Sequence, residues 1–241
     1  MKKILLALMC VCTFTSCAFN DIFKYSKDIN DGTIADFDEY PGMNVNESPL
    51  TGIPFAAPAN FEINNVIMGL QNQSSEEDQN EDLKVTKDMF GSGLFVIVTL
   101  DITNLSSSKQ TLTLPCGLLL QSASSSYQNG ILVKDVLIPF KANERRHVSV
   151  RFYCLNAAAH GSDSEAIFGL GYVTNIPAFE PLFTVCAEKK LNISEYNSSN
   201  ILSYYSACTL VQEIVWAITK GKIFEESDIR KYLKHVKKTT E

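Results

Sequence analysis

The most reactive side chains in the body of the chain belong to four cysteines: Cys116, Cys154, Cys186 and Cys208. They show no C-x-x-C spacing, which argues against a zinc site and against thioredoxin-like chemistry. Four cysteines allow three pairings, and an exported chain meets an oxidising compartment. We therefore expect one or two structural disulfides among these four residues, with free buried thiols as the alternative.

The remaining reactive residues form no catalytic or metal-binding pattern. Ser106-Ser107-Ser108-Lys109 matches S-x-x-K, but it lies in a predicted turn without a partner motif. The three histidines, His147, His160 and His235, are scattered and have no clear acidic partner. Gly91-Ser92-Gly93 lacks the third glycine and the following helix of a dinucleotide site. We therefore expect no enzyme activity, no metal and no cofactor.

Two short motifs carry a sharper signal. Tyr153-Cys154-Leu155-Asn156 ends a predicted strand, and Val211-Gln212-Glu213-Ile214-Val215-Trp216 lies on a predicted helix beside the only tryptophan. Together they resemble the two signatures of the thioester domains of bacterial surface adhesins. In that family the cysteine sulfur replaces the amide nitrogen of the glutamine, and a host amine or hydroxyl attacks the stored acyl group. The resemblance implies that Cys154 supplies the sulfur, that Gln212 carries the acyl group and that Trp216 covers the bond.

The same residues also have a purely structural interpretation. Ile214 stands where the family has Ala, and Val211 where Thr is usual. In this interpretation Cys154 lies in a strand or a disulfide, while Gln212 and Trp216 pack a helix onto the sheets.

The N-terminus predicts export. Lys2 and Lys3 precede an apolar run from Ile4 to Phe14 that is too short to span a bilayer but has the length of a signal peptide core. The run Phe14-Thr15-Ser16-Cys17 resembles the lipobox of bacterial lipoproteins. The resemblance assigns residues 1–17 to a lipoprotein signal peptide region, and it implies cleavage directly in front of Cys17, which is diacylated and becomes the first residue of the mature chain. An ordinary secretory leader is the alternative. We expect an anchor in the cell membrane or outer membrane, facing the periplasm or the cell surface.

Composition and periodicity divide the rest of the chain into three parts. Residues 18–60 contain four prolines among polar and small residues and predict a flexible tether. Residues 61–190 hold short runs rich in β-branched and aromatic residues, separated by polar turns. This spacing predicts a mainly β fold, an antiparallel immunoglobulin-like β-sandwich. The clearest strands are expected at 93–102, 111–120, 131–140 and 146–155.

Residues 191–241 predict a C-terminal helical segment that packs on the sandwich. Apolar residues recur at helical spacing from Ala207 to Ile218, and Lys220-Gly221 marks a helix end. Ser227 can cap a second helix, whose basic residues form a face typical of a solvated helix end.

These observations predict a non-catalytic role. The net charge of −6 argues against nucleic acid as a partner. We expect a lipid-anchored cell-envelope protein that binds a protein or glycan ligand, or acts in adhesion. The alternatives are covalent capture through Cys154 and Gln212, and a structural subunit of an envelope assembly, for which an exposed apolar patch or sheet edge is expected. The oligomeric state stays open.

Overall fold

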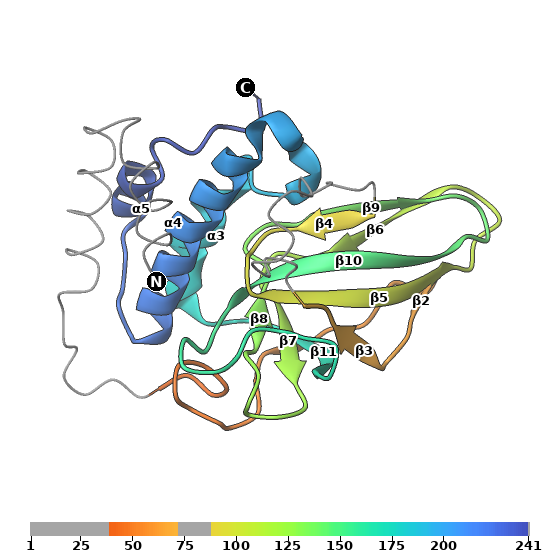
Figure 1. Cartoon of the computed structure of the whole chain (residues 1–241), viewed down its shortest axis with the longest axis horizontal. Helices are drawn as coiled ribbons and strands as arrows, with labels where there is room; N and C mark the ends of the chain where they lie inside the picture. Colours follow the sequence, from red (N-terminus) through yellow and green to blue (C-terminus); the bar gives the residue numbers. More distant parts are fainter. Residues whose placement is uncertain (1–38, 72–87, 241) are drawn as a thin grey trace, which may run out of the picture. The chain divides into compact units, whose positions relative to one another are not determined.

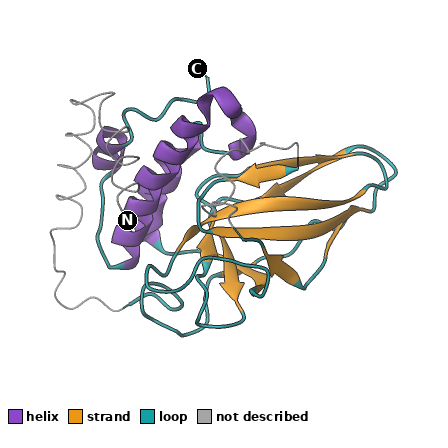
Figure 2. Ribbon diagram, in the orientation of Figure 1, coloured by secondary structure: helices purple, strands orange, loops and turns teal. Residues whose placement is uncertain are grey.

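A computed structural model of the chain describes residues 39–71 and 88–240 (Figures 1 and 2). The strands are β1 (Ile53–Pro54), β2 (Phe61–Ile63), β3 (Ile67–Gly69), β4 (Met89–Gly91), β5 (Val96–Asn104), β6 (Gln110–Leu114), β7 (Leu118–Ser122), β8 (Gly130–Ile131), β9 (Val136–Phe140), β10 (Arg145–Cys154) and β11 (Ile167–Val173). The α-helices are α3 (Glu180–Ala187), α4 (Ile201–Thr219) and α5 (Glu226–Tyr232). Three short 3-10 helices, η1 (Pro177–Phe179), η2 (Ile193–Glu195) and η3 (Ser198–Asn200), complete the described elements.

The expected immunoglobulin-like sandwich is wrong. Six antiparallel strands pair in the closed order β5-β3-β11-β7-β8-β10, and β10 returns to β5. The fold is therefore a closed six-stranded β-barrel with additional strands and a few helices. Strands β1 and β2 pair with β11 and β5, β4 pairs with β10 in parallel, and β6 and β9 form a separate two-stranded sheet.

The long strand β10 closes the barrel because it reaches beyond the end of its neighbour. Residues from Arg145 to Phe152 pair with β5, whereas Tyr153 and Cys154 pair with β8 on the other edge. The side chains of β10 alternate between the barrel interior and the outside. Val150, Phe152 and Cys154 belong to the core of buried apolar side chains inside the barrel.

The outward side chains at the end of β10 are covered by helices instead of solvent. Figure 1 shows the helices gathered at one end of β5 and β10. The Tyr153 hydroxyl donates to the sulfur of Cys208 on α4 (3.7 Å), and the Tyr204 hydroxyl donates to the carbonyl oxygen of Gly93 (3.1 Å). Among the described residues, only Ser198–Thr219 is long and apolar enough to cross a membrane; more than half of that stretch is buried inside the structure. Its apolar surface therefore serves the packing of α4 against the barrel.

The described part of the predicted tether, residues 39–60, packs on the barrel. Met43 and Leu50 are buried, and the backbone N–H of Asn44 donates to the carbonyl oxygen of Leu155 (2.9 Å). Strand β1, within the same stretch, pairs with β11.

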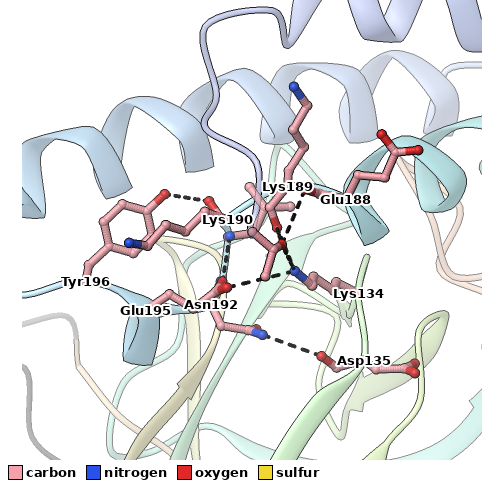
Figure 3. A network of polar contacts seen from close by, with 10 residues as sticks. Lys134, Asp135, Glu188, Lys189, Lys190, Asn192, Glu195 and Tyr196 are labelled. Atoms are coloured by element: carbon pink, nitrogen blue, oxygen red, sulfur yellow. Dashed lines mark hydrogen bonds and ion pairs between the residues drawn. The ribbon is translucent and has the colours of Figure 1, made fainter. Parts of the chain in front are cut away.

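A polar network joins the β8–β9 turn to the C-terminal part of the chain (Figure 3). Lys134 Nζ donates to the carbonyl oxygen of Lys189 (2.6 Å) and to Thr239 Oγ1 (3.0 Å). The carboxylate of Glu195 accepts hydrogen bonds from the backbone N–H groups of Leu191 and Asn192 at 2.9 and 2.7 Å. The network therefore holds the chain end and the loop after α3 against the barrel.

Candidate functional site

The structure brings Cys154 and Gln212 together, although they lie 58 residues apart in the sequence. The backbone N–H of Cys154 donates to Gln212 Oε1 (2.9 Å), and Gln212 Nε2 donates to the carbonyl oxygen of Cys154 (2.9 Å). Both residues are buried. The carboxamide of Gln212 therefore forms hydrogen bonds with both the N–H and the carbonyl group of Cys154, at the end of β10.

This contact has a clear origin in the barrel. Strand β5 begins at Val96, opposite Phe152, so β10 continues past the start of its partner. On the β8 side, the N–H of Leu155 donates to the carbonyl oxygen of Asn129 (3.0 Å). Because successive residues of a strand direct their backbone polar groups to opposite edges, those of Cys154 face the edge where β5 is missing. The carboxamide of Gln212 takes the place of the absent strand and satisfies groups that would otherwise be buried without partners.

The thiol of Cys154 lies in the barrel core, while Gln212 reaches the backbone of the same residue. Burial raises the pKa of the Cys154 thiol, so it stays protonated at neutral pH. Trp216, one turn after Gln212, stacks on Phe95 with 6.2 Å between the ring centres. Its indole Nε1 is buried and has no hydrogen-bond partner among the described residues. The three residues of the thioester prediction thus lie along one face of α4 and the adjoining end of the barrel.

The other cysteines lie apart from this contact. All four cysteines of the described chain are free thiols in the structure. Cys208 accepts the hydrogen bond from Tyr153, and Cys186 is buried on α3. Half-buried Cys116 follows β6, where burial and the negative charge of Asp135 raise the pKa of its thiol to about 12. Cys17 lies outside the described residues.

A polar pocket, which we call the loop pocket, lies among three loops. Its volume is about 360 Å³. It is lined by residues 44–48, by residues 121–125 together with 127 and 129, and by residues 156, 158 and 159. Amide and hydroxyl side chains dominate the lining. Of the described residues that line the pocket, Glu47 alone is charged and none is basic. This composition suits an uncharged ligand that presents hydroxyl groups.

Asparagines build the frame of the loop pocket. Asn156 Nδ2 donates to the carbonyl oxygens of Gly42 (3.1 Å) and Asn44 (3.2 Å), and Asn156 Oδ1 accepts from the backbone N–H of Asn129 (2.9 Å). These hydrogen bonds tie the segment before β1 to the end of β10. The side chains of Gln121 and Ser125 have no hydrogen-bond partner within the described ranges and remain available to a ligand.

Sequence reasoning missed the loop pocket. Residues 121–129, which supply much of the lining, comprise the end of β7 and the loop after it; they are rich in hydroxyl and amide side chains, and such segments are typical of any exposed turn. The pocket forms only when residues 44–48 and 156–159 pack beside that loop.

Apolar side chains are exposed on the outer wall of the barrel. Met68 and Ile167 are register partners on β3 and β11, and they are 41% and 46% exposed. Val66, the residue before β3, is 60% exposed. We call Val66, Met68 and Ile167 the wall strip.

No protein-family model, curated protein or solved structure matches the chain.

Proposed function

We propose that the protein is a lipid-anchored component of the bacterial cell envelope whose barrel binds a hydroxyl-rich ligand, a glycan, in the loop pocket. The lipobox-like run ending at Cys17 supports the anchor, and it predicts that Cys17→Ser abolishes incorporation of labelled palmitate. The observation that carries the binding role is the pocket itself, whose lining is dominated by amide and hydroxyl side chains.

The binding role is tested by blocking the pocket without disturbing the core. Ser125 lines the pocket and is exposed, so Ser125→Trp fills the pocket at little cost to folding. Ser107→Trp, in the exposed β5–β6 turn, is the matched control. On an array of immobilised glycans, the body from residue 18 onward is expected to be retained on a defined subset. Ser125→Trp is expected to lose that retention at least tenfold, while Ser107→Trp keeps it. Retention that Ser125→Trp leaves unchanged contradicts a ligand in this pocket.

Covalent capture is the second candidate function. The contact between Gln212 and Cys154 favours it, because a thioester requires these two residues to be neighbours. Intact-mass spectrometry of the non-reduced body tests it: a mass low by one ammonia, followed by gain of one methylamine, is the expected signature. Cys154→Ala, which keeps the backbone groups that Gln212 binds, is expected to remove that signature. A full mass without a response to methylamine refutes covalent capture.

A structural role in an envelope assembly is the third candidate, favoured by the wall strip. Sedimentation velocity tests it. Self-association that Met68→Lys abolishes supports this role, and a monomer at every concentration measured argues against it.

A further inference from the structure

The turn between β6 and β7 faces helix α3. Gly117 in this turn has φ +79°, and a Cβ built there would lie 3.5 Å from Phe183 Cε2. Phe183 lies one turn before Cys186 on α3, so the two side chains share a side of that helix. Cys116, the residue before Gly117, therefore lies near the side of α3 on which Cys186 is found.

A second set of contacts ties the same two places together. The backbone N–H of Cys116 donates to Asp135 Oδ1 (2.7 Å). The neighbouring residue Lys134 donates from Nζ to the carbonyl oxygen of Lys189, which follows α3 (2.6 Å). Figure 3 shows Lys134 and Asp135 facing the segment after α3. The β8–β9 turn thus holds Cys116 on one side and the end of α3 on the other.

The two thiols are also within electrostatic reach of each other. Burial raises the pKa of Cys186 most strongly, and the Cys116 thiol raises it further, whereas Lys134 and Lys189 act in the opposite direction. The other two thiols have different surroundings: Cys154 lies inside the barrel core, and Cys208 contacts the Tyr153 hydroxyl. Within residues 39–71 and 88–240, Cys116 is half-buried and the other three cysteines are buried. Of these four thiols, Cys116 is therefore the one that an oxidant reaches first.

We propose that Cys116 and Cys186 are a disulfide-forming pair that staples the β6–β7 turn to α3. The proposal rests on the export proposed above, which supplies an oxidising compartment. The oxidant is the disulfide of an oxidoreductase or of glutathione. Its S–S bond breaks as Cys116 forms a mixed disulfide with it, and Cys186 then displaces the oxidant's sulfur. The Cys116–Cys186 bond forms, two protons leave the protein thiols, and the oxidant ends as two thiols.

The staple would act on folding more than on binding. It joins two segments separated by strands β7 to β11 in the sequence, so it restricts a long loop of the unfolded chain. Reduction is therefore expected to lower the denaturation midpoint of the oxidised wild type. The same treatment is expected to leave Cys116→Ser and Cys186→Ser unchanged, because neither variant can form the bond.

Oxidation of the purified full chain with glutathione disulfide tests the pairing independently of export, lipid and glycan. Non-reducing peptide mapping is expected to recover one peptide linking Cys116 to Cys186, with a mass lower by two hydrogens. Cys154→Ser and Cys208→Ser serve as matched controls and are expected to keep this link. Alkylation of the wild type before and after reduction gives a readout that needs no variant: Cys116 is expected to be labelled only after reduction. A link between Cys186 and Cys208 overturns the proposal, and so does a result in which Cys116, Cys154, Cys186 and Cys208 all stay reduced.

Discussion

Replacing Gln212 by methionine isolates the contact that joins α4 to the end of the barrel. Methionine has a similar shape and length, so packing changes little. The substitution removes two hydrogen bonds of 2.9 Å and leaves the N–H and carbonyl groups of Cys154 buried without partners. An unsatisfied buried group costs about 1 to 3 kcal/mol, so the loss of both partners is expected to lower the free energy of unfolding by about 2 to 6 kcal/mol.

The assay is equilibrium unfolding in urea, followed by tryptophan fluorescence, because Trp216 lies one turn from the substitution. Gln128→Met is the matched control. Gln128 is also buried, but it makes one side-chain hydrogen bond, to the carbonyl oxygen of Ala159 (2.7 Å), and its Oε1 has no partner in the described chain. Its replacement is expected to cost less than about 1 kcal/mol, because one unsatisfied oxygen disappears with it. If Gln212→Met lowers the free energy of unfolding no more than Gln128→Met does, then the hydrogen bonds of the Gln212 carboxamide do not replace those of a neighbouring strand at Cys154.

Three further predictions concern other parts of the barrel. Arg151 is buried, and its Nε has no hydrogen-bond partner among the residues described. Arg151→Met is therefore expected to raise the free energy of unfolding, measured in urea, by at least about 1 kcal/mol. A loss of stability would show that other contacts of the guanidinium offset the cost of burying it. Gly93 has φ +126°, and a Cβ added to it would lie 2.1 Å from the carbonyl oxygen of Phe152. A Cβ added to Gly169 would meet no atom within 4 Å. Gly93→Ala is therefore expected to lower the thermal midpoint by more than about 10 °C and Gly169→Ala to change it little, and equal effects would contradict this backbone geometry. The pKa of Asp101 is lowered, most strongly by the hydrogen bond from Arg145 and further by the Arg145 charge. The pair therefore stabilises the fold above the ordinary aspartate pKa, and this stabilisation is lost as the pH falls through the lowered pKa. Wild type is expected to exceed Arg145→Met in stability at pH 6, and the difference is expected to shrink as the pH falls below the ordinary aspartate pKa; a difference that stays constant down to the most acidic pH at which both proteins fold refutes the linkage.

The longest strands, β5 and β10, and the main helix could be predicted because their signals are local, whereas the run predicted as one strand at 131–140 is divided between β8 and β9. The run predicted at 146–155 corresponds to β10, Arg145–Cys154, and the apolar stripe from Ala207 to Ile218 lies within α4. The run predicted as one strand at 111–120 is two strands, since the chain turns between β6 and β7, where Gly117 has a positive φ. Proline and glycine in the middle of that apolar run were the signal for this break.

The sequence alone determined which residues alternate between buried and exposed positions in the longest strands, and where the apolar face of α4 lies. It did not decide between a sandwich and a barrel, because both bury one face of each strand and produce the same period of two. Only the tertiary structure decided that β10 pairs with both β5 and β8 and so closes the sheet. Closure also leaves the backbone of Cys154 without a strand beside it, and this vacancy explains why Gln212, distant in sequence, reaches that residue. Pairings of this kind depend on which edges remain open after the whole sheet has formed, and no local pattern of residues records that.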